Sequence, residues 1–254
     1  MHSKYSWCLG TDASSESILQ SLDKEGVDTS HVYQGDPFRA SYSAILMLNG
    51  GERTILNYKG TMPTAHHSEL DLSVIAEGDW IYISSLGDMD LLEKIISTAA
   101  EHGVKVMLNP AGVELQNPDK LKGLLEDVQV LTVNKEEAQV IVHGETIEEL
   151  ARHANHYCPV VIVSDGPNGA VATDGKTIVT AGMYEDVPVV DRTGGGDAFG
   201  SGFLSQYAQG ETLKQSMLFA SANSTSVVQY IGAKEGILHG KVALHDMPLE
   251  EKEF

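Results

Sequence analysis

Apolar residues from about residue 90 onward follow two patterns, with helical spacing in some segments and short unbroken runs in others. Between residues 90 and 102 they form one stripe, made of Leu91, Leu92, Ile95, Ile96 and Ala99, which predicts an amphipathic helix that Gly103 can end. Short unbroken apolar runs alternate with such segments. We predict strands at 104–108, 128–133, 160–163 and 187–190, and helices at 90–102, 135–142, 146–157, 198–208 and 213–230. This alternation is typical of an α/β protein whose mostly parallel sheet is covered by helices on both faces.

Two segments depart from this alternation. Residues 41–48 and 53–58 are rich in β-forming residues and are joined by Asn49-Gly50-Gly51-Glu52, which predicts an antiparallel hairpin within a flap at about 38–59. Residues 169–180 predict a second hairpin that turns at Asp174-Gly175. No repeat or low-complexity linker divides the chain, so residues 1–254 are expected to form a single domain. The acidic end, 249–254, is expected to be frayed and solvated.

The chain is strongly acidic, with a net charge of −19 from 17 basic and 36 acidic residues. Such a surface repels nucleic acid, and any bound nucleotide must be held by backbone amides, a metal ion or a few local cations. No apolar run has the length of a membrane span, and the N-terminus does not resemble a secretion signal. Cys8 and Cys158 do not form a disulfide framework, which favours reduced thiols and a cytoplasmic location.

Three consecutive glycines, Gly194, Gly195 and Gly196, stand directly before a helix-forming run. Glycine lets the backbone approach a ligand closely, and the amides at a helix start favour an anion such as a phosphate. Asp197 follows them, and a carboxylate there would repel the anion unless it serves as the base that accepts a proton from an attacking hydroxyl. The alternative is a glycine-rich turn with Asp197 as an ordinary N-cap.

Other nucleotide and metal motifs do not match. The chain has no Gly-x-x-x-x-Gly-Lys-Ser/Thr loop, and its glycines at 194, 195, 196, 200 and 202 do not fit the dinucleotide fingerprint, which argues against a dehydrogenase. His153 and His156 with Cys158 fit no standard ligand spacing. The adjacent His66-His67 pair likewise favours a solvated surface over a metal site.

The segment 191–199, followed by Gly200-Ser201-Gly202-Phe203, resembles the signature of the PfkB/ribokinase family of carbohydrate kinases, Asp-Thr-x-Gly-Ala-Gly-Asp-x-Phe. Arg192 replaces the usual Thr and adds a local cation, and Gly195 replaces the usual Ala. The resemblance implies a ribokinase-like three-layer αβα fold with a small antiparallel β lid. It also implies ATP-dependent phosphorylation of a sugar or nucleoside-like hydroxyl, with Asp197 as the base and Gly194–Gly196 as an anion hole.

Further segments resemble the family in its order along the chain, from about residue 9 to about residue 238. They are 51–55 (lid strand), 109–111 (sugar side), 134–137 (magnesium and phosphate), 164–170 (nucleotide-side turn), and 220–223 with 232–233 (adenine). The resemblance implies Asn109 as a substrate ligand, Asn134 and Glu137 as Mg²⁺ ligands through water, and Asp191 and Thr193 as K⁺ ligands. It implies nucleotide contacts from Ser164, Gly166, Gly169, Asn223 and Gly232, and a homodimer through the lid strands.

Each of these motifs also has a purely structural interpretation. Asn134 followed by Glu137 matches a helix capping box, which is compatible with a metal-water contact. Ser164 and Gly166 can be plain turn residues. Asn223 can be a solvated position in a helix, and Asp191 can simply form a turn.

The family resemblance lacks its usual beginning. An opening strand, a sugar-binding Asp, a Gly-Gly substrate loop and a helix normally precede the segment that resembles 8–28, and none precedes Met1. We therefore expect the chain to be N-terminally truncated relative to the family, with much of the sugar-binding half absent. The alternative function is a truncated, non-catalytic nucleotide-binding protein or gene fragment.

Overall fold

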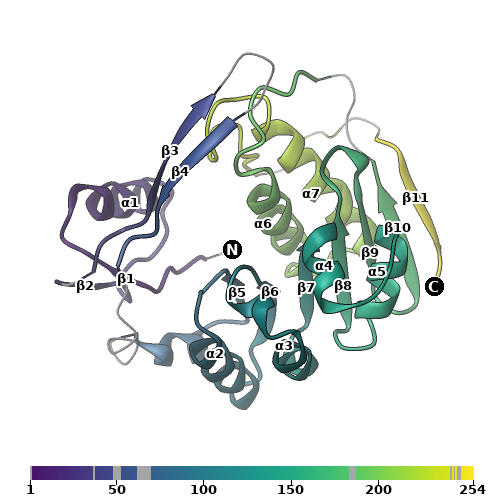
Figure 1. Cartoon of the computed structure of the whole chain (residues 1–254), viewed down its shortest axis with the longest axis horizontal. Coiled ribbons are helices and arrows are strands. Elements are labelled where there is room, and N and C mark those ends of the chain that lie inside the picture. The colour runs from purple at the N-terminus through teal and green to yellow at the C-terminus, as the bar shows by residue number, and fades with distance from the viewer. Residues whose placement is uncertain are drawn as a thin grey trace. The chain divides into compact units, whose positions relative to one another are not determined.

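The computed structural model describes residues 2–36, 38–47, 53–61, 70–182, 187–240, 242, 244 and 247–254. It divides the chain into two compact units, Met1–Gly78 and Asp79–Phe254 (Figure 1). The expected turn at 49–52 and the His66-His67 pair lie outside the described residues.

The first unit holds the small antiparallel sheet that the sequence predicted. Its elements are β1 Cys8–Leu9, α1 Ala13–Lys24, β2 Tyr33–Gln34, β3 Tyr42–Met47, β4 Arg53–Tyr58 and the 3-10 helix η2 Leu72–Glu77. Strands β3 and β4 pair antiparallel, from Tyr42 opposite Tyr58 to Met47 opposite Arg53. Helix α1 begins at Asp12, whose carboxylate accepts hydrogen bonds from the amides of Ser14 and Ser15. Both strands of the antiparallel pair fall within the expected 38–59 segment.

The second unit is built on one sheet. In the part that the structure describes, its elements are β5 Trp80–Ser84, α2 Met89–Glu101, β6 Lys105–Asn109, η3 Glu114–Gln116, α3 Pro118–Leu124, η4 Leu125–Asp127, β7 Val130–Asn134, α4 Lys135–Ile141, α5 Ile147–Ala154, β8 Val160–Ser164, η5 Gly166–Asn168, β9 Ala170–Thr173, β10 Thr177–Ala181, α6 Gly195–Tyr207, α7 Leu213–Val227 and β11 Leu249–Glu253. The sheet has seven strands in the order β11-β10-β9-β8-β7-β6-β5. Strands β5 to β8 are parallel and β8 to β11 antiparallel.

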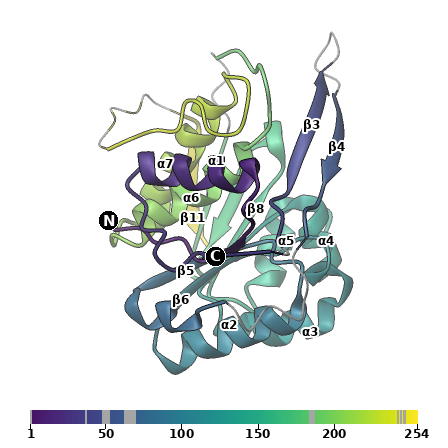
Figure 2. The ribbon, with the colours of Figure 1, turned by 90° about the vertical axis from the view of Figure 1, so that its left-hand side faces the viewer.

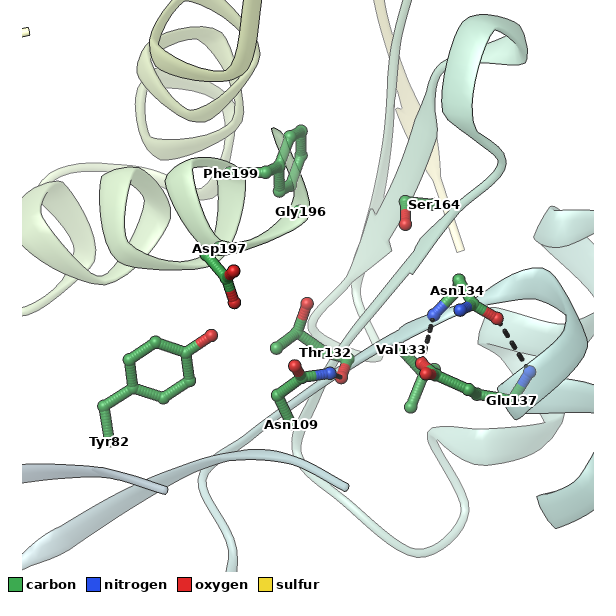
Figure 3. Close-up of a pocket in the computed structure, with 10 residues that line it drawn as sticks. All are labelled: Tyr82, Asn109, Thr132, Val133, Asn134, Glu137, Ser164, Gly196, Asp197 and Phe199. Carbon is green, nitrogen blue, oxygen red and sulfur yellow. Dashed lines mark hydrogen bonds between the residues drawn. The ribbon is translucent and has the colours of Figure 1, made fainter. Parts of the chain in front are cut away.

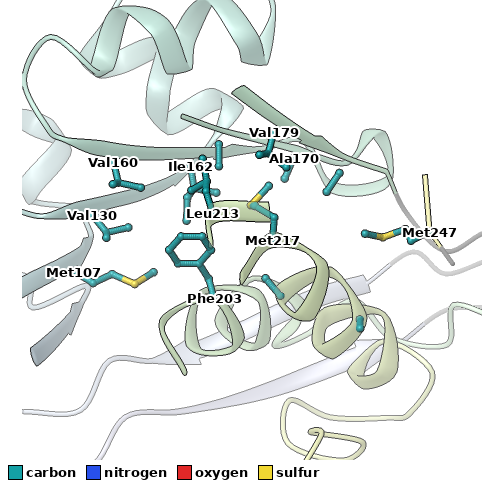
Figure 4. Close-up of a cluster of buried hydrophobic side chains, with 14 residues drawn as sticks. Met107, Val130, Val160, Ile162, Ala170, Val179, Phe203, Leu213, Met217 and Met247 are labelled. Atoms are coloured by element: carbon teal, nitrogen blue, oxygen red, sulfur yellow. The ribbon is translucent and has the colours of Figure 1, made fainter. Parts of the chain in front are cut away.

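Helices cover both faces of this sheet, which confirms the predicted layered α/β class. Figures 1 and 2 show α6 and α7 on one face and α2 to α5 on the other. Side chains alternate across the strands, so Val130, Val160 and Ile162 face Phe203 of α6 and Met217 of α7 (Figure 4). All five are buried, and this packing holds α6 against the sheet. The sheet is mixed rather than mostly parallel, because a hairpin and the C-terminal strand extend its far half.

Most predicted elements form within a few residues of the expected bounds, including the hairpin at 174–175, but two predictions are wrong. Residues 187–190 form no strand: Val190 and Asp191 donate their amides to the carbonyl of Val228 instead, which leaves the segment without a strand partner. The acidic end is not frayed, because Leu249–Glu253 forms β11 and pairs antiparallel with β10. Ion pairs join it to neighbouring elements, from Lys252 to Glu148 of α5 (2.7 Å) and from Lys214 of α7 to Glu251 (3.2 Å).

Deletion of residues 249–254 should destabilise the second unit by on the order of 2 kcal/mol, because the lost ladder hydrogen bonds outweigh the regained chain entropy. It should also promote self-association through the uncovered edge of β10. Urea denaturation and light scattering measure both effects. Lys252→Gln removes only an exposed ion pair and should cost no more than about 1 kcal/mol. An unchanged urea midpoint after the deletion would contradict this role for β11.

Candidate active site

The carboxyl ends of three neighbouring parallel strands bring the predicted polar residues together. Asn109 ends β6, Asn134 ends β7 and Ser164 ends β8, and Asn134 pairs in register with Ser164. They line a cavity of about 210 Å³ that the start of α6 also borders (Figure 3). Its lining residues are Tyr82, Asn109, Thr132, Val133, Asn134, Glu137, Ser164, Gly196, Asp197 and Phe199. Residues predicted for substrate, metal and catalysis therefore share one cavity.

The first turn of α6 sets the position of Asp197. Gly194 is the N-cap, with a left-handed φ of 79°, and an added Cβ there would lie 2.6 Å from the Cα and carbonyl oxygen of Ala233. Gly195 and Gly196 already belong to the helix, so only Gly194 precedes it. The interpretation of Asp197 as the N-cap is wrong, because Asp197 is the third helical residue. Its side chain points into the cavity (Figure 3).

The carboxylate of Asp197 is available for chemistry. It makes no hydrogen bond or ion pair to any residue that the structure describes. The side chain reaches solvent, but the cavity walls remove part of the water around the carboxylate, and this desolvation raises the pKa of Asp197. An unpartnered carboxylate with a raised pKa is suited to accept a proton.

The amides around the glycines are not equivalent. The amide of Gly195 donates to the carbonyl oxygen of Arg192 at 3.3 Å. Among the described residues, the amides of Gly194, Gly196 and Asp197 have no acceptor, as is usual at a helix start. The amides of Gly194 and Gly196 are therefore open to an anion and that of Gly195 is not; anion binding at these three glycines stays a prediction.

Asn134 and Glu137 form the capping box that the sequence predicted. The Asn134 side chain accepts from the Glu137 amide, and one carboxylate oxygen of Glu137, Oε2, accepts from the Asn134 amide, both at 2.8 Å (Figure 3). Burial raises the pKa of Glu137. The other oxygen, Oε1, has no hydrogen-bond partner within the described ranges. Capping thus uses half of the carboxylate and leaves Oε1 for a ligand.

A second cavity of about 160 Å³ adjoins the first. It shares Ser164, Gly196 and Phe199 with the larger cavity and is lined further by Gly166, Gly169, Ala170, Gly182, Val189, Arg192, Gly195, Ser221, Ser224, Thr225 and Val228. Three of the predicted nucleotide residues line it, namely Ser164, Gly166 and Gly169. Asn223 and Gly232 do not.

Asn223 has a structural role. It is 3% exposed, and its carboxamide donates to the carbonyl oxygen of Ala198 at 2.7 Å and accepts from the amide of Leu238 at 2.8 Å. The interpretation of Asn223 as a solvated helix position is therefore wrong. Its contact with a nucleotide stays a prediction. Both the nitrogen and the oxygen of the carboxamide already have a hydrogen-bond partner in the protein.

Asp191 organises the loop before α6. One oxygen accepts from the amide and the hydroxyl of Thr193, at 3.0 and 2.7 Å. The other accepts from the amide of Gly232 at 3.1 Å, which places Gly232 in this loop network rather than in the cavity. Asp191 is 6% exposed. It therefore forms the turn that the sequence allowed, and K⁺ binding there remains a prediction.

Four lining residues of the larger cavity were not predicted as site residues: Tyr82, Thr132, Val133 and Phe199. Thr132 and Val133 directly precede the predicted segment 134–137, and Phe199 ends the signature 191–199, so their positions in the sequence could have indicated them. Tyr82 belongs to β5, a strand that was not predicted. The apolar run 80–84 was the available signal.

Both the sequence and the fold of this chain resemble those of known proteins. A family model described as pfkB family carbohydrate kinase matches residues 2–239. A ribokinase of Haemophilus influenzae is 24% identical over 241 residues, which cover 91% of this chain and 76% of the relative. Two solved structures share the fold. An Escherichia coli protein provisionally named ribokinase II, in complex with ATP and Mg²⁺, has a TM-score of 0.81 at 19% identity, covering 94% of this chain and 80% of its own.

The second structure is ribokinase of Arabidopsis thaliana complexed with ribose and ATP. Its TM-score is 0.78 at 20% identity, and the match covers 93% of this chain and 78% of that one. These likenesses confirm the predicted ribokinase-like fold. No helix in the described ranges has both the length and the apolar character needed to cross a membrane. Because this family model matches nearly the whole chain, and because the signature stands at the start of α6, this chain belongs to the pfkB family of carbohydrate kinases.

Proposed function

We propose that the chain transfers the γ-phosphoryl group of ATP to a hydroxyl of a sugar or nucleoside-like acceptor. The observation that carries this proposal is the unpartnered carboxylate of Asp197 at the start of α6, which lines the larger of two adjoining cavities beside unpaired amides. The larger cavity would take the acceptor, with Asn109 on its floor. The smaller would take the nucleotide, and the shared Gly196 marks the meeting point.

This layout would serve an in-line phosphoryl transfer. Asp197 accepts the proton of the acceptor hydroxyl, whose oxygen bonds to the γ-phosphorus while the bond to the β-phosphate oxygen breaks and ADP leaves. The amides of Gly196 and Asp197 stabilise the transferring group. A carboxylate repels the phosphoryl group and does not bind it. Both the raised pKa of Asp197 and its place in the acceptor cavity favour a role in accepting the proton of the acceptor.

The site fits a magnesium ion held mainly by phosphates and water. The described residues contain no cluster of three or more His, Cys, Asp or Glu that would cage a metal. Glu137 nevertheless presents a carboxylate oxygen to the cavity beside Asn134. Mg²⁺ keeps several waters and binds through few carboxylates, so Glu137 and Asn134 would order its water. The ion supplies charge neutralisation for the phosphates.

Two further features belong to the proposal. The buried carboxylate of Asp191 with Thr193 would support a K⁺ site near the anion hole, which rates in KCl and NaCl test. The small sheet exposes Tyr42, Leu46 and Leu56, which supports a homodimer through the lid strands. Sedimentation velocity tests the homodimer.

We also propose that residues 1–254 form a single ribokinase-like domain.

ADP release with a panel of acceptors tests the function. The panel spans a pentose, a phosphorylated hexose, a deoxy sugar acid and nucleosides: D-ribose, fructose 6-phosphate, 2-dehydro-3-deoxygluconate, cytidine and adenosine. We expect ADP release that depends on one of these classes. ATP binding without acceptor-dependent turnover for any of them would contradict kinase activity and support a nucleotide-binding protein.

Arg192→Gln should raise KM for ATP about 5- to 10-fold. Arg192 is the cation that lines the nucleotide cavity, and it has no ion pair within the described residues, so it is available for a charge-assisted contact with phosphate. The wild-type KM should rise with salt more steeply than that of the variant. Lys94→Gln makes the same charge change on an exposed face of α2 and should leave KM unaltered. Equal KM values and salt dependence in the wild type and Arg192→Gln would exclude the contact.

A further inference from the structure

Tyr82 places a phenol in the acceptor cavity without an assigned task. Its hydroxyl makes no hydrogen bond to any residue in the described parts of the chain, although the ring is half-buried. Tyrosine hydroxyls in partly buried sites usually find a hydrogen-bond partner. An unpaired hydroxyl that faces a cavity therefore points to a partner in the ligand.

The position of Tyr82 depends on a glycine of α6. An added Cβ at Gly200 would lie 2.5 Å from the Tyr82 hydroxyl oxygen, so only a glycine lets the phenol reach this far. Gly200 and Asp197 are three residues apart and lie on the same face of α6. The phenol tip is consequently held beside the Asp197 carboxylate. Figure 3 shows both groups pointing into the same part of the cavity, one from β5 and one from α6.

The chemistry of the phenol limits what it can do. Burial and the nearby charge of Asp197 both raise the pKa of Tyr82. The hydroxyl therefore stays protonated at neutral pH and can donate a hydrogen bond, but it does not compete with Asp197 as a base.

We infer that the Tyr82 hydroxyl donates a hydrogen bond to the acceptor oxygen that Asp197 deprotonates, and so holds that oxygen in line with the γ-phosphorus. This inference rests on the proposed kinase function. Tyr82 keeps its own proton throughout, since the proton of the acceptor goes to Asp197. The ligand class is a polyol, in which a hydroxyl can donate to Asp197 while accepting from Tyr82.

Tyr82→Phe tests the contact, because phenylalanine keeps the ring and removes only the hydroxyl. With the best acceptor of the panel, kcat/KM for the acceptor should fall about 3- to 10-fold while KM for ATP stays constant. Tyr207→Phe is the matched control. Tyr207 packs against the rings of Trp80 and Phe203 and lines neither cavity. Tyr207→Phe should therefore leave both kinetic constants unchanged.

Gly200→Ala adds a second test. The added methyl should displace the phenol and lower kcat/KM for the acceptor in the Tyr82 background, whereas in the Tyr82→Phe background it should cost much less. Wild-type kinetics for Tyr82→Phe, with the wild type active, would overturn the inference and leave the kinase function intact. Absence of acceptor-dependent turnover in the wild type would overturn both.

Discussion

Asp197→Asn is expected to lower kcat by about 10²- to 10⁴-fold while KM for ATP changes little. Asparagine keeps the shape of the side chain but cannot accept the proton of the acceptor hydroxyl. The carboxylate makes no hydrogen bond or ion pair with other described residues, so its replacement leaves no group of this unit without its hydrogen-bond partner. ADP release measured with a saturating acceptor gives kcat directly. Equal rates in the wild type and the variant would exclude Asp197 as the base.

Melting temperatures, together with a variant outside the site, show whether Asp197→Asn loses activity through unfolding. Asp119 is an exposed carboxylate on α3, and Asp119→Asn should change neither rate nor melting temperature. Because desolvation raises the pKa of Asp197, the folded state binds its proton more tightly than the unfolded state does. The charged form is thus slightly unfavourable at neutral pH. Asp197→Asn should therefore melt at an equal or slightly higher temperature at pH 7, so a loss of activity would not reflect unfolding.

The same raised pKa sets the pH dependence of turnover. Proton acceptance requires the carboxylate, so kcat should rise with pH through the pKa of Asp197, which lies above its ordinary value. Protein stability changes in the opposite direction. The contribution of Asp197 to stability weakens as the pH rises through its ordinary and its raised pKa. A site residue that costs stability and supports activity is common at catalytic centres.

Local patterns in the sequence predicted the parts of the fold that depend on neighbouring residues. The apolar stripe of α2 and the capping box of Asn134 and Glu137 each lie within one helix, and both formed as predicted. The cluster at the carboxyl ends of β6, β7 and β8 also follows from parallel strands and short loops. The mostly parallel sheet was right only for β5 to β8.

The missed features depend on contacts distant in sequence. Residues 249–254 appear too acidic to order, and the ion pair of Lys252 with Glu148, 104 positions away, cannot be seen in a local window. Asn223 looks like a polar helix residue until α6 and residue 238 approach it. Tyr82 lies on one of two alternating faces of β5, and only the approach of Gly200 shows which face meets the cavity. Tertiary packing, rather than local propensity, decides all three.

Gly196→Ala should separate stability from activity most sharply. An added Cβ at Gly196 meets no atom within 4 Å, so the fold tolerates it, and alanine in place of a helical glycine should stabilise α6 by up to about 1 kcal/mol. The methyl group would nevertheless stand in the space that the two cavities share. We expect kcat/KM to fall at least about 100-fold, because phosphoryl transfer depends on an in-line approach that small displacements disrupt.

Two other glycines make the comparison decisive. Gly123→Ala adds a methyl group to helix α3, also into open space but outside both cavities, and should stabilise the protein without changing its rate. Gly194→Ala forces a left-handed residue against the backbone of Ala233 and should lower the melting temperature. Melting temperatures and ADP release measured on all three variants distinguish the explanations. If Gly196→Ala stays fully active, the shared space does not hold the transferring phosphoryl group; if it loses activity only together with stability, the glycine serves the fold rather than the reaction.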